Sequence, residues 1–509
     1  MIVIGAGVGG LVASLLLAVD GFDVTVLERA DTPGGKMRVA THGAIRIDAG
    51  PTVFTLRGIF DEIFAAAGAS LADHVSLRPV ETLARHAWSE HERLDLYCSI
   101  ERSVDAIGAF AGAAEARRYR EFAECARRMY ATLEAAFIRA PATSALGLVR
   151  SAHGRQGLAD LWHIRPFATL WQALQGHFRD PRLRQLFARY ATYCGSSPFR
   201  CPATLMLIAH AERTGVWLVD GGMRRLAEGL AAVATAHGAT FRYGADVVGL
   251  AYRDGRVAGV QLASGEQIAA DAIVANADVA AIASGGLGRD AAHAVPRVPR
   301  SARSLSALTW TMVARTAGFP LHRHNVFFSG DYRAEFDDLF AHGRLPRSPT
   351  VYVCAQDRDD EGVCASAMPE RLLCLVNAPP TGDCHSFTPA EIEQCEKRTF
   401  DLLARCGLDV MRSSENTTIT TPEDFERLFP GTGGALYGRA THGWAASFRR
   451  PGARSRIPGL YLAGGSTHPG AGVPMAALSG RMAAATLCAD RASTSRSRLA
   501  GMPGGISTH

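Results

Sequence analysis

The first residues of the chain alternate between apolar runs and short polar breaks in a way that predicts a strand, a helix and a second strand. Ile2-Val3-Ile4 is a β-branched run of the kind found in fully buried strands. Leu11 to Ala18 is expected to form a helix, and Asp23 to Leu27 a second strand that ends at Glu28. This succession is the start expected of an α/β domain.

The same pattern returns between residues 215 and 276. A strand and a polar loop precede a helical stripe, and a hairpin with an Asp-Gly turn precedes another strand. The residues concerned are Val216–Val219, Asp220-Gly221-Gly222-Met223, Leu226, Leu230 and Val233, then Ala245–Arg253 and Arg256–Leu262 joined at Asp254-Gly255, and Ala269–Ala275. Residues 215–276 are therefore expected to rejoin the first α/β region.

A third α/β segment lies near the end of the chain. Ile457 to Gly465 predicts a strand that enters a glycine turn, and a helix with Leu478 and Met482 on one side follows. Pro474 is placed as the first helical residue, where its missing N–H costs nothing. Residues after 490 lose the apolar periodicity and are expected to form a flexible tail.

Composition and charge exclude several classes of protein. With 47% hydrophobic and 20% charged residues the chain is not mostly disordered, and a net charge of +5 over 509 residues excludes a strongly basic nucleic-acid binder. The 11 cysteines contain no Cys-x-x-Cys pair, so no metal site is expected, and most of the thiols are interpreted as buried and reduced. The apolar run Leu11–Val19 is too short to span a bilayer and resembles no signal peptide. We expect a soluble, cytoplasmic protein.

The loop after the first strand carries the pattern G-x-G-x-x-G, in the segment Gly5-Ala6-Gly7-Val8-Gly9-Gly10. Gly5 permits a tight turn, Gly7 lets the backbone approach a pyrophosphate, and Gly10 lets the helix pack on the strand. Glu28 stands where a carboxylate would accept ribose hydroxyls, which favours FAD or NAD over a 2′-phosphate. A glycine turn with a backbone role alone is the competing interpretation. The strand before the loop, the helix after it and the acidic residue Glu28 all stand where a dinucleotide-binding motif requires them, which favours that interpretation.

The next residues resemble a known family. The run from Glu28 and Arg29 through Gly34, Gly35, Lys36, Met37 and Arg38 resembles the extended FAD signature of the amine oxidase and carotenoid desaturase superfamily. The resemblance implies that a loop at Gly35 folds over FAD and that Lys36 or Arg38 offsets pyrophosphate charge. Asp48-Ala49-Gly50-Pro51-Thr52 is similar to the segment that passes near the flavin in carotenoid desaturases. Its alternative is a strand followed by a Gly-Pro turn.

The segment Thr467-His468-Pro469-Gly470-Ala471-Gly472-Val473-Pro474 resembles the C-terminal signature of bacterial carotenoid desaturases of the phytoene desaturase type. The resemblance implies flavin contacts at Gly464, Gly465, Val473, Pro474 and Met475. A helix N-terminus at this place would stabilise negative charge on a reduced flavin. Val247 matches a position that touches the adenine through its backbone, and ordinary strand core is an equal alternative.

Two segments are closer to one branch, the hydroxyneurosporene (1-hydroxycarotenoid 3,4-) desaturases. They are Asp48 to Gly68 and Val219 to Met223. The branch implies an FAD-dependent enzyme that introduces a C3–C4 double bond into 1-hydroxy or 1-methoxy acyclic carotenoids, by hydride transfer to flavin N5. The alternatives are a desaturase of phytoene or another polyene, an amine oxidase, and a flavin-free lipid chaperone. The intact Gly5, Gly7, Gly10 and Glu28 disfavour the chaperone.

The resemblance also implies the architecture, an α/β fold with a Rossmann-like FAD-binding domain of the GR2 type and an inserted α+β substrate domain. Residues 1–75, 215–285 and 441–490 are assigned to the FAD-binding domain, 76–214 and 286–440 to a substrate and membrane-facing domain, and 491–509 to the tail. The substrate domain holds aromatic residues that could line a site for an elongated apolar ligand, with plain core as the alternative. They are Trp162, Phe167, Trp171, Phe178, Phe187, Trp310, Phe327 and Phe328.

Catalytic groups and partners are less defined. His468 is a weak catalytic candidate that could equally cap its loop, and no acid or base has support. The absence of a second G-x-G-x-x-G after a strand leaves oxygen or a quinone as the expected electron acceptor. A lipophilic carotenoid requires contact with a membrane surface, expected at residues 158–176 on the inner face of a bacterial membrane. The residues invoked are Leu158, Leu161, Trp162, His163, Arg165, Phe167, Leu170, Trp171 and Arg179; internal packing is the alternative.

Overall fold

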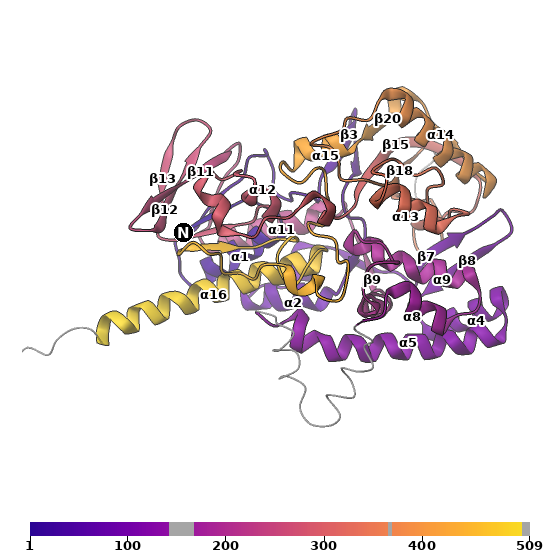
Figure 1. The fold of residues 1–509 in the computed structure, drawn as a ribbon, viewed down its shortest axis with the longest axis horizontal. Helices are drawn as coiled ribbons and strands as arrows, with labels where there is room; N and C mark the ends of the chain where they lie inside the picture. Colours follow the sequence, from indigo (N-terminus) through magenta and orange to yellow (C-terminus); the bar gives the residue numbers. More distant parts are fainter. Residues whose placement is uncertain (142–166, 365–368, 501–509) are drawn as a thin grey trace, which may run out of the picture.

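A parallel sheet of five short strands forms the centre of one half of the protein, in a computed structural model that describes residues 1–141, 167–364 and 369–500 (Figure 1). The strand order is β10-β2-β1-β14-β21, and every neighbouring pair is parallel. The strands are β1 (Ile2–Ile4), β2 (Thr25–Leu27), β10 (Thr240–Arg242), β14 (Ile273–Ala275) and β21 (Leu460–Leu462). Three segments that are distant in sequence therefore build one sheet, as the repeated α/β pattern predicts.

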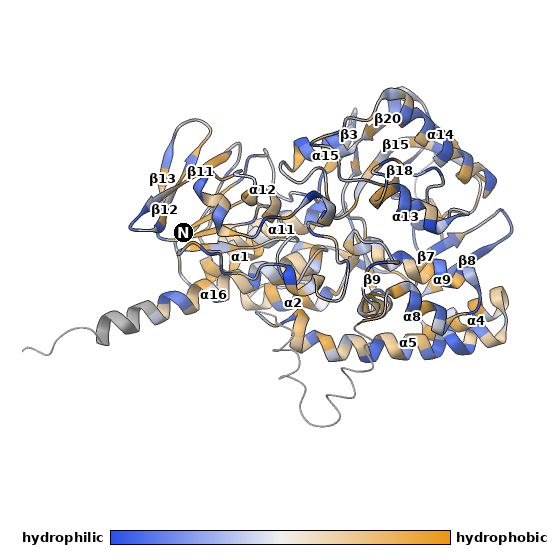
Figure 2. Ribbon diagram, viewed as in Figure 1, coloured by the Kyte–Doolittle hydropathy of each residue, from blue (hydrophilic) through white to orange (hydrophobic). Residues whose placement is uncertain are grey.

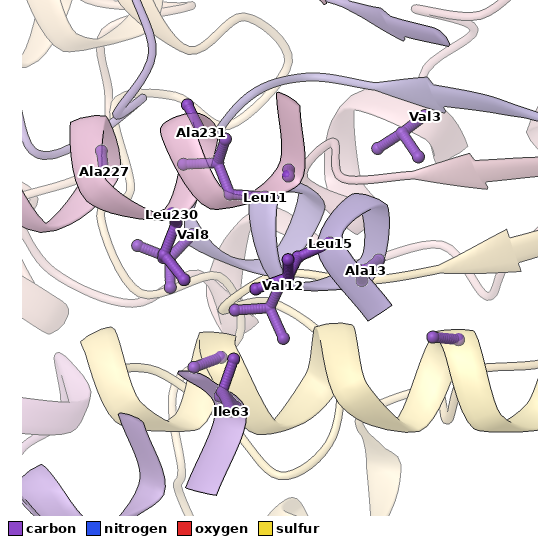
Figure 3. Close-up of a cluster of buried hydrophobic side chains, with 14 of the residues drawn as sticks. Val3, Val8, Leu11, Val12, Ala13, Leu15, Ile63, Ala227, Leu230 and Ala231 are labelled. Atoms are coloured by element: carbon purple, nitrogen blue, oxygen red, sulfur yellow. The ribbon is translucent and has the colours of Figure 1, made fainter. Parts of the chain in front are cut away.

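One face of this sheet is covered by helices. They are α1 (Val8–Val19), α2 (Arg57–Ala66), α3 (Leu71–His74), α11 (Arg224–Ala236) and α16 (Val473–Ala500). Figure 3 shows side chains of α1, among them Leu11, Val12 and Leu15, between α11 and α16. All three are fully buried. Burial of each side chain of this size contributes about 1.5–3 kcal/mol, so α1 is held by the core on several sides.

The other face of the parallel sheet packs against a smaller layer. It contains the antiparallel sheet β11-β12-β13 and the short helices beside it. The elements are β11 (Val247–Arg253), β12 (Arg256–Leu262), β13 (Gln267–Ala269), α12 (Val279–Ala283) and η4 (Asp290–Ala294); η5 (Arg300–Ala302) follows in the chain. Asp254 and Gly255, which join β11 to β12, both have positive φ angles of 51° and 73°. This is the conformation that the Asp-Gly pair predicts for a tight hairpin.

The second half of the protein is built on a mixed sheet of eight strands in the order β19-β15-β18-β17-β16-β7-β8, with β20 paired to β15. Only the β16–β7 pair is parallel. The strands are β7 (Thr82–Ala87), β8 (Arg93–Tyr97), β15 (Ser306–Gly318), β16 (His324–Phe327), β17 (Val351–Ala355), β18 (Glu370–Ala378), β19 (Leu408–Met411) and β20 (Thr417–Thr420). The β16–β7 pair joins residues from before and after the 215–285 region into one sheet.

Helices cover both faces of this sheet, and each face has its own apolar core. On one face lie α4 (Ile100–Ala111), α5 (Ala113–Leu133), η1 (Glu134–Ile138), α8 (Leu170–His177), α9 (Pro181–Ala188), η2 (Arg189–Cys194), η3 (Ala203–Met206), α10 (Leu207–Arg213) and α13 (Tyr332–Phe340). On the other lies α14 (Pro389–Arg405), and α15 (Pro422–Leu428), η6 (Ser414–Asn416) and η7 (Ala446–Arg449) follow it in the chain. Figure 2 shows the hydrophilic residues along the outer edges, for example on β8 and β12.

Two small sheets connect the halves. One has the order β5-β9-β6, with β5 (Phe54–Thr55), β6 (Leu77–Pro79) and β9 (Val216–Val219), and the other pairs β3 (Val39–His42) with β4 (Ile45–Asp48). The predicted strand at Val216–Val219 therefore exists, but it lies outside the parallel sheet because it pairs with β5 and β6 instead.

Two further boundaries differ from the sequence-based expectation. The run Ala269–Ala275 is not one strand: β13 ends at Ala269 and β14 begins at Ile273, in different sheets. The last helix begins at Val473, so Pro474 is its second residue, and it continues to Ala500, past residue 490. Polar residues can extend a helix without apolar periodicity once a buried first half has nucleated it.

Candidate functional site

The glycine loop connects the buried strand β1 to the buried helix α1. Gly7 is the N-cap residue and α1 has no side-chain cap, so the amide groups of its first turn are not occupied by a capping side chain. Uncapped amides and the helix dipole together attract an anion such as a phosphate. A methyl group at Gly10 would lie 2.1 Å from the carbonyl oxygen of Gly5. Close packing of helix on strand therefore requires glycine there, as the motif predicts.

Glu28 lies at the end of β2, beside that loop, and is 8% exposed. Its Oε2 accepts a hydrogen bond from the Ala6 N–H at 2.6 Å and its Oε1 accepts from Ala30 N–H at 2.9 Å. The Ala245 N–H donates to the Glu28 carbonyl at 2.9 Å, which places the start of β11 and Val247 next to this carboxylate. The geometry brings together the predicted ribose and adenine contacts. Arg29 is exposed at the rim.

Asn276 is a central residue of the site that sequence reasoning missed. Its Nδ2 donates to the Gly5 carbonyl at 3.3 Å. A methyl group at Gly7 would lie 2.7 Å from that nitrogen, and one at Gly464 would lie 2.8 Å from the Asn276 Oδ1. The side chain thus stands between the first glycine loop and the loop after β21. Its position directly after an apolar strand was the available signal.

The second loop, at Gly34 and Gly35, folds onto the first. The Gly34 N–H donates to the Ala6 carbonyl at 2.9 Å, and a methyl group at Gly35 would lie 3.2 Å from the Gly7 Cα. Met37 next to it is buried. This is the close approach that the extended signature implies.

Lys36 and Arg38 have partners elsewhere. The Lys36 Nζ donates to the Leu436 carbonyl at 2.7 Å, and Arg38 donates to Thr420 Oγ1 at 3.1 Å. Burial lowers the pKa of both groups. The proposed pyrophosphate contact of these two cations stays a prediction.

The Gly50-Pro51-Thr52 segment follows β4 and lies against the Lys36 loop, because a methyl group at Gly50 would stand 1.9 Å from the Lys36 carbonyl oxygen. Just before it, Asp48 Oδ2 accepts from the Met223 N–H at 2.9 Å, at the start of α11. Burial raises the pKa of Asp48. The two segments that carry the branch-like sequence, at Asp48 and at Met223, are thus in direct contact.

The C-terminal motif completes this face of the site. The Gly464 N–H donates to Ser479 Oγ of α16 at 2.7 Å, which fixes the loop with Gly464 and Gly465 against that helix. Val473, Pro474 and Met475 form the first turn of α16. The structure thus brings the C-terminal loop and the first glycine loop together around Asn276.

Arg450 is a second residue that sequence reasoning missed, since it lies outside the motif. It is 7% exposed, and its guanidinium donates to three carbonyl groups, those of Gly465 at 2.9 Å, Tyr437 at 3.1 Å and Arg439 at 2.7 Å. Burial lowers its pKa. A buried cation held beside the C-terminal loop favours negative charge nearby.

His468, the weak catalytic candidate, faces the α5–η1 region. Its Nε2 bonds the Ala140 carbonyl at 2.9 Å, and its ring makes an edge contact with Phe137 at 5.1 Å. Burial lowers its pKa. Because a carbonyl can only accept, Nε2 carries the proton and Nδ1 does not. These contacts explain a structural role, and a catalytic role stays a prediction.

Most of the proposed lining aromatics belong to the two cores. Phe178, Phe187, Trp310, Phe327 and Phe328 are fully buried. Among the residues proposed for membrane contact, Leu170 is fully buried, and Trp171 packs on Phe199 at 4.9 Å. Arg179 is exposed, while Leu158, Leu161, Trp162, His163 and Arg165 lie outside the described residues.

Phe167 differs from these, since it is 75% exposed and its ring centroid lies 5.7 Å from that of the half-exposed Trp444.

Within the described part of the chain, no helix is long and apolar enough to cross a membrane. The same residues contain no group of three or more His, Cys, Asp or Glu side chains placed to hold a metal ion.

The arrangement of glycine loops, helix terminus and carboxylate fits a dinucleotide with free ribose hydroxyls. The two glycine loops leave room for backbone only, as the close approaches at Gly7, Gly10 and Gly35 show. Glu28, Val247 and the first turn of α16 lie at different places around these loops, so one extended ligand could touch all of them.

Comparisons with known proteins agree with this geometry. The family described as flavin containing amine oxidoreductase matches residues 8–488. The hydroxyneurosporene desaturase of Rubrivivax gelatinosus is 55% identical over 100% of this chain and 97% of its own length. The 1-hydroxycarotenoid 3,4-desaturase of a Flavobacterium species is 30% identical over 95% of this chain and 98% of its own. Among solved structures, a putrescine oxidase variant has a TM-score of 0.58 at 12% identity, covering 96% of this chain and 98% of its own. The last comparison concerns the fold alone.

Proposed function

The chain belongs to the flavin-containing amine oxidoreductase family, and we propose that it is an FAD-dependent desaturase that introduces the C3–C4 double bond into 1-hydroxy acyclic carotenoids during carotenoid biosynthesis. The observation that carries the proposal is the 55% identity to a hydroxyneurosporene desaturase over the whole chain. The contacts of Glu28 with the first glycine loop, and of that loop with the Gly34–Gly35 and Gly464 loops around Asn276, support the proposal.

Bound FAD supplies the hydride acceptor, so the protein need not provide a nucleophile or a metal. Glu28 binds the ribose hydroxyls, and the uncapped first turn of α1 binds the pyrophosphate. The first turn of α16 and the Arg450 guanidinium favour negative charge beside the C-terminal loop. The role of the substrate half is to orient a long apolar chain and to exclude water.

The second candidate function is desaturation of phytoene or another polyene, since enzymes of that kind share the family signatures. Co-expression distinguishes the two. In cells that accumulate 1-hydroxyneurosporene we expect a product with one more conjugated double bond, identified by its absorption spectrum and mass. In cells that accumulate only phytoene we expect no coloured product. Coloured products from cells that accumulate only phytoene would contradict the proposal and favour the second candidate.

We further propose that the protein docks on the cytoplasmic surface of a bacterial membrane and passes electrons to oxygen or a quinone. Its proposed substrate dissolves in the bilayer, so the site must reach the lipid surface. The exposed Phe167–Trp444 pair provides interfacial aromatic groups, and Phe167 belongs to the 158–176 segment proposed for membrane contact. Two exposed arginines could meet anionic headgroups at this place. The Arg200 carbonyl accepts a hydrogen bond from the N–H of Gly443, the residue before Trp444, and Arg449 follows Trp444 by five residues.

A further inference from the structure

A cluster of buried polar side chains lies in the substrate half, outside the cofactor motifs. It consists of His86 on β7, Arg189 on η2, His324 on β16 and Tyr332 on α13, and is called the polar cluster below. Their exposed fractions are 0%, 7%, 3% and 7%. Within the described chain, Nε and Nη2 of Arg189, Nε2 of both histidines and the Tyr332 hydroxyl have no hydrogen-bond partner. A buried polar group without a partner costs about 1–3 kcal/mol, so five such atoms on four neighbouring residues favour a polar ligand or ordered water here.

The four side chains occupy one region. The positive charge of Arg189 is close enough to lower the pKa of both histidines: for His86 it follows the larger effect of burial, and for His324 it follows burial and the charge of Arg323. β7 and β16 are neighbouring parallel strands, and His86 stands opposite Val326, two residues from His324 on the same face of the sheet. The Phe328 ring stacks on His86 at 6.1 Å and meets Tyr332 at 6.4 Å.

Arg189 is held firmly from one side. Its Nη1 donates to the Tyr193 hydroxyl at 2.8 Å, and that hydroxyl donates to Glu212 at 2.7 Å. The Tyr190 hydroxyl donates to the same carboxylate at 2.5 Å. Burial raises the pKa of both tyrosines, so they remain donors. The Nη2 of Arg189 also approaches the Glu212 Oε1 to 3.9 Å, an ion pair that is too long for a hydrogen bond. These contacts fix the guanidinium, while its Nε and Nη2 hydrogens have no hydrogen-bond acceptor among the described residues.

His86 provides the opposite kind of group. Its Nδ1 bonds the Leu94 carbonyl at 3.1 Å, and because a carbonyl only accepts, Nδ1 carries the proton. Burial and the Arg189 charge lower the pKa of His86, so the ring is neutral and Nε2 holds a lone pair. The polar cluster thus offers donors on Arg189 and an acceptor on His86. A hydroxyl group, which accepts and donates at once, satisfies both.

We propose that the polar cluster binds the hydroxyl group at the end of the carotenoid substrate and thereby selects hydroxylated chains. This inference rests on the proposed function. In a 1-hydroxycarotenoid, a single carbon separates the hydroxyl-bearing carbon from the C3–C4 bond, so the hydroxyl site must adjoin the flavin. The structure provides this link: His324 Nδ1 bonds the Tyr352 hydroxyl at 2.7 Å, and that hydroxyl bonds Thr52 of the predicted flavin segment at 2.7 Å.

The test compares 1-hydroxyneurosporene with neurosporene, which lacks the hydroxyl, using flavin-loaded protein and substrates in liposomes. A site built to bind a hydroxyl rejects the analogue that lacks it, so we expect wild-type kcat/KM to favour the hydroxylated substrate by more than about 100-fold. In Arg189→Met this ratio should fall at least about tenfold. Arg184→Met is the matched control, because Arg184 donates to the Phe178 and Arg179 carbonyls on the same segment. It should keep the wild-type ratio.

Tyr332→Phe gives a milder variant that removes one unpartnered hydroxyl and keeps the ring packing, should Arg189→Met fail to fold. It should lower the same ratio severalfold with normal flavin content. Equal losses on both substrates, or an unchanged ratio, in a folded and flavin-loaded variant would overturn the inference alone. A wild-type protein that acts on neither substrate would overturn the proposed function and the inference with it.

Discussion

Among single residues, Glu28 gives the most direct test of the cofactor site. Its carboxylate accepts from two backbone N–H groups and stands where ribose hydroxyls would bind. In Glu28→Gln the shape remains, but the charge is lost and an amide N–H₂ replaces one acceptor. A hydrogen bond to a charged group contributes about 1.5–3 kcal/mol, so flavin affinity should fall roughly 10- to 100-fold.

Flavin absorbance per mole of purified protein measures this loss. Asp31→Asn is the matched control, since Asp31 is an exposed carboxylate three residues along the same loop, and it should retain wild-type flavin. Full flavin occupancy in Glu28→Gln would remove the basis for assigning the ribose contact.

The residues that could be predicted from sequence are those whose role depends on local backbone geometry. Gly10 is an example, because strand, turn and helix are contiguous in the chain and the missing side chain follows from their packing. Asn276 and Arg450 could not be predicted in this way. Their contacts are with Gly5 and with Tyr437 and Gly465, so their role appears only once segments distant in sequence have come together.

At the level of elements, the contact of α1 with α16 connects the first and last motifs. A methyl group at Gly480 of α16 would lie 2.1 Å from the Gly9 carbonyl oxygen of α1. Gly480→Ala must therefore separate the helices, and overpacking of this kind costs about 1–3 kcal/mol. We expect a lower Tm, and lower flavin content because Gly9 belongs to the cofactor loop.

Gly58→Ala serves as the control for that prediction. Gly58 is a helical glycine on α2 with no atom within 4 Å of an added methyl group. Alanine favours a helix over glycine, so its Tm should be equal to or above that of the wild type. If the Tm of Gly480→Ala equals that of the wild type, α1 and α16 can move apart without a loss of stability.

The helices and strands themselves were predictable where the period was strong, as in α11 with Leu226, Leu230 and Val233 all buried. The partners of a strand were not. Val216–Val219 has the apolar run of a parallel-sheet strand, yet it pairs antiparallel with β5 and β6. A run of buried residues is compatible with either sheet, and the choice depends on which distant edge is free.

For the whole molecule, the repeated α/β pattern and the family resemblance together assigned three distant parts of the chain to one α/β region, and all three contribute strands to the parallel sheet. The eight-stranded sheet was harder to foresee, because its β16–β7 pairing joins residues 325–327 to residues 85–87 across the intervening α/β segment. Pairing at that separation leaves no local signature. The β16–β7 pairing matters for the proposed hydroxyl site, because it brings His86 close to His324 in the polar cluster.

The proposed membrane contact is tested on the whole protein by flotation with liposomes. Trp171 and Leu170 pack inward, so the variant should instead remove the exposed pair, as Phe167→Ser with Trp444→Ser. We expect recovery with the vesicles to fall severalfold, and more so when anionic lipid is omitted, because interfacial aromatics and headgroup charge both contribute to binding. Val248→Ser with Tyr252→Ser removes two comparably exposed apolar residues on the β11–β12 hairpin and should float as the wild type does. If the Phe167–Trp444 variant is folded, loaded with flavin and still floats fully, the lipid surface is met by another part of the molecule.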